Sequence, residues 1–171
     1  METWDAITSR RNVRRFTAEP VPAESLERIL EAGRRSPSSR NEQRWDFVAV
    51  TDRDQLRRLS GVWRGAGWIA DAPAAVAVVA PIAGDRHEHG SIQYDLGQTT
   101  TFMMLAAADL GLGAGHAAVE DQELARQVLG LPDDRELAWI IGLGHPADGP
   151  LRPIRRPDRR PIDDVVHRDR W

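Results

Sequence analysis

The chain has 171 residues, of which 41% are hydrophobic and 29% charged, and its formal net charge of -3 gives no reason to expect a nucleic-acid or membrane partner. There is no cysteine, which excludes a disulfide, a thiol nucleophile and a cysteine-ligated metal and fits a reducing cytoplasm. No segment reaches the roughly 20 apolar residues of a membrane span, and charged residues interrupt the N-terminus where a signal peptide would have its apolar core.

The first predicted element is a short helix over residues 3–10, with Thr3 as a candidate cap. It leads into RRNVRRF at residues 10–16, where four arginines crowd into one turn. Such a cluster repels itself unless anions neutralise it, and the arginine fork matches a phosphate. We therefore expect a phosphate-binding turn. The alternative is a solvated basic turn that only complements the helix dipole. The four arginines are Arg10, Arg11, Arg14 and Arg15.

A clear amphipathic helix is predicted over residues 23–34, because apolar residues recur there at i, i+3, i+4 and i+7. A polar loop at 36–43 and a strand at 45–50 follow. The hydroxyls and amides of the loop can hydrogen-bond the edge of a heteroaromatic ring without adding charge. An ordinary helix-terminating loop would have the same composition.

The middle of the chain alternates helix and strand signals. We predict a helix over residues 53–60, an irregular glycine-containing stretch from 61 to 67, and a strand over 74–80. The last of these is apolar on both faces, as in a central strand. A polar loop is expected at 84–90.

The positions of the histidines and the absence of lysine limit the kinds of catalytic site that the chain can form. His87 and His89 stand in the predicted loop at 84–90 without the helical spacing of a zinc motif, so no metal site is predicted. His116 and His145 follow glycine-containing turns, and no base partner or nucleophile elbow accompanies them. Because the chain has no lysine, it cannot form a lysine Schiff base.

The longest helical pattern covers residues 91–110 and is apolar almost all round, so we expect a second subunit to bury part of it. Glycines at 111–115 are interpreted as a helix cap, because a dinucleotide-binding fingerprint would need a preceding strand. A short helix over 121–129 and a buried strand over 137–146 complete the series.

Residues 147–171 form an arm rich in proline and arginine, with apolar residues near its end. Such an arm can wrap around its own domain or a partner subunit, although its arginines at 155–160 would also suit a solvated tail. No internal repeat is present. We predict one α+β domain over residues 1–171, with helices flanking a sheet of about four strands.

Taken together, these stretches resemble the FMN-dependent nitroreductase family, and the match follows the family's order through most of the chain. Each stretch is a weak signal, but six of them in the required order are specific. The matching stretches are RRNVRRF at 10–16, ILEAGRRSPSSRNEQRWDFVAV at 29–50, DAPAAVAVV at 71–79, DLGQTTTFMMLAAADLGLGAG at 95–115, IIGLGHPAD at 140–148 and RRPIDDVVHRDRW at 159–171.

The resemblance implies a homodimer with a central, mostly antiparallel sheet, an exchanged C-terminal arm and FMN at the subunit interface. It implies ping-pong electron transfer from NADH or NADPH through the flavin to a nitroaromatic, a quinone or a related small molecule. No side chain need then act as acid or base, because the cofactor carries the chemistry. Two alternatives are specialised flavin chemistry (dehydrogenation, dehalogenation or flavin fragmentation) and a non-enzymatic FMN-binding protein.

The resemblance also implies roles for the arginines. Arg10, Arg11 and Arg14 would hold the FMN phosphate, joined by Arg159 or Arg160 from the arm.

Two positions depart from the family pattern. Asn12 stands where the family usually has serine, and Arg44 stands where it usually has proline. The amide of Asn12 would still contact ribityl or phosphate oxygens. The remaining implied FMN contacts are Pro37, Ser38, Ser39, Asn41 and Gln43 from the other subunit, Arg64 at the pyrimidine edge, and His116, Ala117 and Ala118 at the reactive edge.

Overall fold

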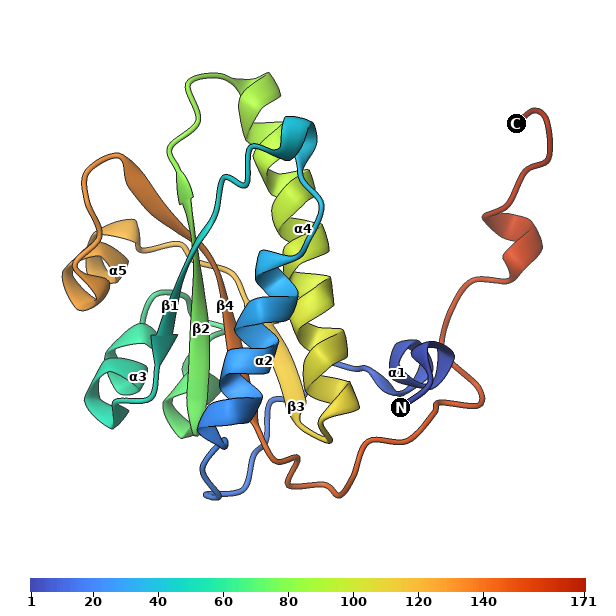
Figure 1. The fold of residues 1–171 in the computed structure, drawn as a ribbon, viewed down its shortest axis with the longest axis horizontal. Helices are drawn as coiled ribbons and strands as arrows, with labels where there is room; N and C mark the ends of the chain where they lie inside the picture. The colour runs from blue at the N-terminus through green and yellow to red at the C-terminus, as the bar shows by residue number, and fades with distance from the viewer.

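The computed structural model covers residues 1–171 and contains a four-stranded antiparallel sheet with helices on both faces (Figure 1). The strand order is β1-β2-β4-β3, and all three pairings are antiparallel. This confirms the predicted α+β class and the antiparallel sheet. The strands are β1 (Asp46–Val50), β2 (Ala74–Pro81), β3 (Gly113–Ala117) and β4 (Arg135–Gly144).

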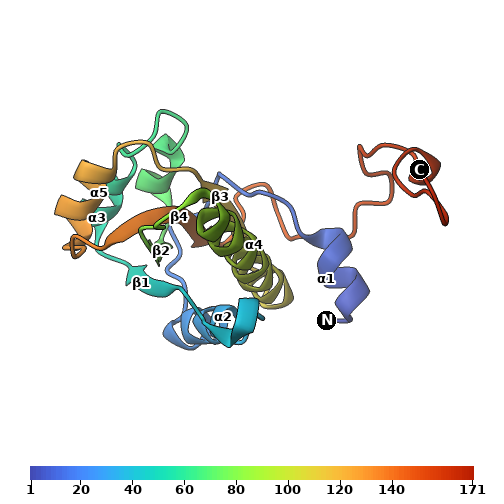
Figure 2. The ribbon, with the colours of Figure 1, turned by 90° about the horizontal axis from the view of Figure 1, so that it is seen from above.

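Two hydrophobic layers flank the sheet (Figure 2). One contains α2 (Ala23–Arg34) and α4 (Arg86–Asp109), and the other contains α3 (Arg53–Leu59) and α5 (Gln122–Leu129). Alternate residues of β2 enter opposite layers, since successive side chains of a strand point to opposite faces. Val76 packs with α2 and α4, whereas Ala77 packs with α3 and α5. The prediction of a central strand buried on both faces is confirmed.

Helix α4 begins earlier than predicted. Residues 86–90, expected in a polar loop, form its first turn. The reason is a reciprocal cap: the side chain of Asp85 accepts the Glu88 N–H at 2.8 Å, and the Glu88 carboxylate accepts the Gly84 N–H at 2.7 Å. An acidic cap followed three residues later by glutamate is a sequence signal for a helix start, so the composition of this stretch was misleading.

The glycines at 111–115 do more than end α4. Gly111 has a φ of 76° and closes the helix, as predicted. Gly113 and Gly115, however, belong to strand β3, which the sequence interpretation did not include. Four of the five residues of β3 are glycine or alanine, so the β-branched and aromatic residues that usually indicate a strand are missing here.

Helix α1 (Thr3–Ser9) lies beside the C-terminal end of α4, where the Met1 ammonium contacts Asp109 at 2.7 Å. Thr3 does not cap the helix, because the cap position is Glu2. The arm continues from β4 past α1, where the Ile154 N–H donates to the Thr8 carbonyl at 3.0 Å, and then leads away from the sheet (Figure 1). Three short 3-10 turns lie at Ser39–Asn41, Gly67–Asp71 and Ile162–Asp164.

Several large apolar side chains are exposed in the single chain. Trp4 on α1 and Tyr94 on α4 are each 72% exposed, and Phe102 on α4 is 41% exposed. The apolar end of the arm is exposed as well. No helix has both the length and the apolar character needed to cross a bilayer.

Candidate functional site

The arginine turn is fixed to the free edge of β3. Asn12 forms a parallel bridge with Ala114, and the Val13 N–H donates to the Ala114 carbonyl at 2.9 Å. This close approach needs glycine on the strand, because a Cβ on Gly115 would lie 2.4 Å from the Val13 carbonyl oxygen. The glycine-rich sequence after α4 therefore creates the seat of the arginine turn.

Phe16 fixes the other end of the turn. It bridges Pro146 after β4, and a Cβ on Gly144 would meet its ring at 2.9 Å. The rings of Phe16 and Trp68 lie 6.1 Å apart between centroids. Phe16 thus anchors the turn against Trp68 and the end of β4.

Three of the four arginines in the turn have no carboxylate partner. Arg15 pairs with Asp148 at 3.0 Å, whereas Arg10, Arg11 and Arg14 form no ion pair. Arg11 donates only to the Arg152 carbonyl, at 3.4 Å, and the Arg14 guanidinium lies 6.0 Å from the centre of the Trp68 ring. Three arginines of one turn are therefore left without a carboxylate partner and are available to an anionic ligand such as a phosphate.

His116 on β3 lies next to these arginines. Its ring meets Trp139 edge-on, with centroids 5.7 Å apart, and the two rings line a cavity of about 340 Å³ together with Arg10. Desolvation lowers the pKa of His116 below its usual 6.5, and the charges of Arg10 and Arg14 lower it further. The imidazole is therefore neutral at pH 7 and faces a cavity with a positive rim.

The same cavity has a polar wall on α4 that the sequence analysis did not single out. Gln93, Gly97, Thr100 and Thr101 lie on one side of the helix, at i, i+4, i+7 and i+8. A polar stripe at this spacing in an otherwise apolar helix was the available signal. The indole N–H of Trp139 donates to Gln93 Oε1 at 3.2 Å.

The segment after β3 is tied to the loop that carries Arg64. The carbonyl of Val62 accepts the N–H groups of Glu120 and Asp121, both at 2.9 Å. Ala117 is buried and Ala118 is half-buried just before this junction. Arg64 itself is exposed and makes no hydrogen bond or ion pair within the chain.

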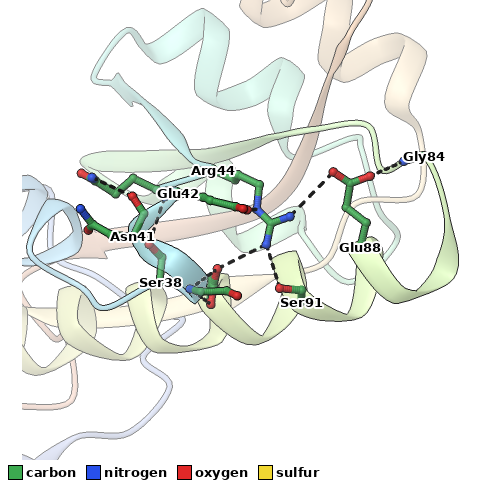
Figure 3. A network of polar contacts seen from close by, with 10 residues as sticks. Ser38, Asn41, Glu42, Arg44, Gly84, Glu88 and Ser91 are labelled. Carbon is green, nitrogen blue, oxygen red and sulfur yellow. Dashed lines mark hydrogen bonds and ion pairs between the residues drawn. The ribbon is translucent and has the colours of Figure 1, made fainter.

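The polar loop lies elsewhere, beside the N-terminal half of α4 (Figure 3). The Ser39 N–H donates to both carboxylate oxygens of Asp95, at 3.1 Å each. Pro37, Asn41 and Gln43 are exposed around it. Within one chain, no contact joins this loop to the arginine turn.

The distal arginines of the arm form hydrogen bonds only within the arm. Arg159 donates to the Asp158 carbonyl and Arg160 to the Asp164 carbonyl, both at 2.6 Å. The single chain thus gathers the candidate residues of the turn, of β3 and of the segment after it. It leaves the residues of the polar loop and of the distal arm apart.

The chain is similar to known proteins of one family. The family model described as "Nitroreductase family" matches residues 7–145. An Archaeoglobus fulgidus protein named as an NADH dehydrogenase/NAD(P)H nitroreductase is 30% identical over 174 residues, covering 99% of both chains. The FMN reductase [NAD(P)H] of Bacillus subtilis is 27% identical, covering 99% of this chain and 74% of its own. The structure of an FMN-dependent nitroreductase from Clostridium difficile superposes with a TM-score of 0.84 at 24% identity, covering 97% of this chain and 98% of that one.

Proposed function

The chain belongs to the nitroreductase family, and from this premise we propose that it is an NAD(P)H-dependent oxidoreductase with FMN as its cofactor. The observation that carries the proposal is the arginine turn, where Arg10, Arg11 and Arg14 lie without carboxylate partners on the edge of β3. Electrons would pass from NADH or NADPH to a small-molecule acceptor such as a nitroaromatic or a quinone.

The residues of the site fit FMN. The unpaired arginines would supply the charge for its phosphate, and the guanidinium of Arg14 lies within cation–π distance of the Trp68 ring, at 6.0 Å from its centre. The lack of carboxylate partners for these arginines is an observation independent of the family match.

FMN, when bound, supplies the two-electron transfer between a nicotinamide and an acceptor. The residues of this chain bind and orient it. The arginine turn would hold the phosphate, Asn12 would offer an amide to the oxygens next to it, and the backbone of Ala117 and Ala118 would face the flavin ring. The neutral imidazole of His116 adds no positive charge beside these groups, because its pKa is lowered.

We further propose that the site is completed in a homodimer. The polar loop and the arginine turn are not in contact within one chain, so a partner's loop would supply Ser38, Ser39, Asn41 and Gln43. The exposed Trp4, Tyr94 and Phe102 support this proposal, because large aromatic side chains that are this exposed are typical of contact surfaces.

The test is an absorbance spectrum of the purified protein after addition of FMN, with and without NADH and NADPH under anaerobic conditions. We expect bound flavin whose visible absorbance is bleached by one of the two nucleotides and restored by a quinone. A protein that does not bind FMN would refute the proposal. Bound FMN that neither nucleotide reduces would favour specialised flavin chemistry, and reduction with no acceptor turnover would favour a flavin-binding role.

A further inference from the structure

The polar loop has a backbone that non-glycine residues rarely adopt. Arg40, Asn41 and Gln43 have φ angles of 52°, 58° and 52°, which lie in the left-handed region. Three such residues within four positions persist only where the surroundings hold them. The question is which contacts do so.

One set of contacts holds the start of the loop. Asp95 on α4 accepts the Ser39 N–H with both oxygens at 3.1 Å, and Ser38 Oγ accepts the Gln43 N–H at 3.0 Å. Asp95 is only 2% exposed. A carboxylate this deeply buried needs an opposite charge as well as hydrogen bonds.

Arg44 supplies that charge from the end of the loop. Its Nη2 lies 3.7 Å from Asp95 Oδ2 and donates to Ser91 Oγ at 2.8 Å (Figure 3). Its other nitrogens contact Glu42 at 3.1 Å and Glu88 at 3.7 Å. Among the ion pairs of the chain, Arg44 is the only cation that reaches Asp95.

Arg44 thus joins both ends of the loop to α4. The guanidinium contacts three turns of the helix through Glu88, Ser91 and Asp95, and its side chain is 17% exposed. A planar fork with five donors can serve several acceptors at once, which a lysine ammonium cannot do with the same geometry.

The backbone gives a second reason why this residue matters. A proline at position 44 would push Gln43 towards an extended conformation, because the proline ring clashes with a helical or left-handed residue before it. With Arg44 in place, Gln43 keeps its φ of 52°, and its side chain donates to the Asn41 carbonyl at 3.2 Å.

From these contacts we infer that Arg44 positions the polar loop at 36–43 for FMN binding. It compensates the buried charge of Asp95 and permits the left-handed backbone at Gln43. The exposed Ser39 and Asn41 are thereby held in a fixed conformation in which they meet FMN across the subunit interface. This inference rests on the proposed function.

The experiment compares Arg44→Gln, Arg44→Lys and Arg44→Pro in the full-length protein. FMN affinity is measured by fluorescence quenching, together with the visible spectrum of the bound flavin and the values of kcat and KM. We expect Arg44→Gln to weaken FMN binding about tenfold or more and to shift the flavin spectrum. Arg44→Lys should bind FMN more tightly than Arg44→Gln but less tightly than the wild type, and Arg44→Pro should bind no better than Arg44→Gln.

Arg126→Gln is the matched control. Arg126 on α5 is also mostly covered, at 27% side-chain exposure, and bonds the Pro132 and Arg135 carbonyls at 2.5 and 3.3 Å. Its loss should lower stability while leaving the affinity and spectrum of the folded protein unchanged. A pure stability role for Arg44 would make the two variants alike, and that result would overturn the inference.

A double variant keeps the test valid if Arg44→Gln fails to fold. Arg44→Gln with Asp95→Asn removes both buried charges, so it should be more stable than Arg44→Gln alone and still bind FMN weakly. Wild-type affinity and an unshifted spectrum in a folded Arg44 variant would overturn the inference. A wild-type protein that binds no FMN would instead refute the proposed function, so the two failures are distinguishable.

Discussion

At the scale of single residues, the contrast between Arg14 and Arg15 separates a binding role from plain charge. Both are exposed arginines in one turn, but only Arg15 has an ion-pair partner in the chain, Asp148 at 3.0 Å. Arg14→Ala should weaken FMN binding by about 1.5–3 kcal/mol, or roughly 10- to 150-fold, because it removes a charge-assisted contact to the phosphate. Isothermal titration with FMN measures this.

Arg15→Ala is the control for that measurement. It removes the same charge from the same turn, so it should reduce FMN affinity by much less. Equal losses in the two variants would show that the turn acts only through its overall charge, and the assignment of Arg14 to the phosphate would then be wrong.

His116 offers a second prediction at this scale, from the direction of its pKa. Burial and the nearby Arg10 and Arg14 depress that pKa below 6.5. The unfolded chain therefore binds the proton more tightly, and the free energy of unfolding of the apo protein should rise with pH through the interval just below 6.5. FMN should raise the pKa, because a phosphate offsets both arginine charges.

Titration of the histidine ring by NMR, with and without FMN, checks both statements, and His116→Gln identifies the signal. The prediction fails if the apo pKa lies at or above 6.5, or if FMN leaves it unchanged.

At the scale of elements, strand β3 can pair with the arginine turn because its glycines leave room for the backbone of the turn. Gly115→Ala would place a Cβ 2.4 Å from the Val13 carbonyl oxygen, and backbone atoms cannot rotate away as a flexible side chain can. We expect a loss of about 1–3 kcal/mol in the free energy of unfolding and a loss of FMN affinity, because the arginine turn must move. Urea denaturation and FMN titration measure the two effects.

A glycine in α4 provides the comparison. A Cβ on Gly90 would meet no atom within 4 Å, so Gly90→Ala should keep FMN affinity and raise stability by up to about 1 kcal/mol through helix propensity. If Gly115→Ala behaved like Gly90→Ala, the close approach of the turn to β3 would not be required for binding.

At the scale of the whole molecule, the exposed aromatic side chains on α1 and α4 predict a dimer in solution. Phe102→Asp should shift the protein to a monomer, because it places a charge on the expected interface, and FMN affinity should fall with it. Size-exclusion chromatography with light scattering checks the mass. Ile82→Asp, at a position that is 51% exposed on the loop after β2, should leave both properties unchanged.

Deletion of residues 150–171 is the corresponding test of the arm. If the arm reaches a second subunit, its removal should weaken the dimer and lower FMN affinity. A truncated protein with the mass and affinity of the full chain would leave the arm without a part in the site.

The sequence by itself determined most of the elements. Local signals suffice for them: the 3.6-residue apolar period of α2, the Asp52 cap that accepts the Gln55 N–H of α3 at 2.8 Å, and the apolar run of β2. The predicted start of α4 was wrong, because the polar composition of residues 84–90 was given more weight than the capping signal at Asp85. Strand β3 was not predicted, because its small residues have no strand propensity.

The tertiary structure alone decided how those elements form a site. The pairing of Asn12 with Ala114 and the reach of Arg44 to Asp95 join residues that are distant in the chain, and no local pattern encodes such contacts. The arginine turn was visible in the sequence as a cluster of charge. That three of its arginines lack counter-charges follows only from where the carboxylates of the folded chain lie, because ion pairing depends on distance in space.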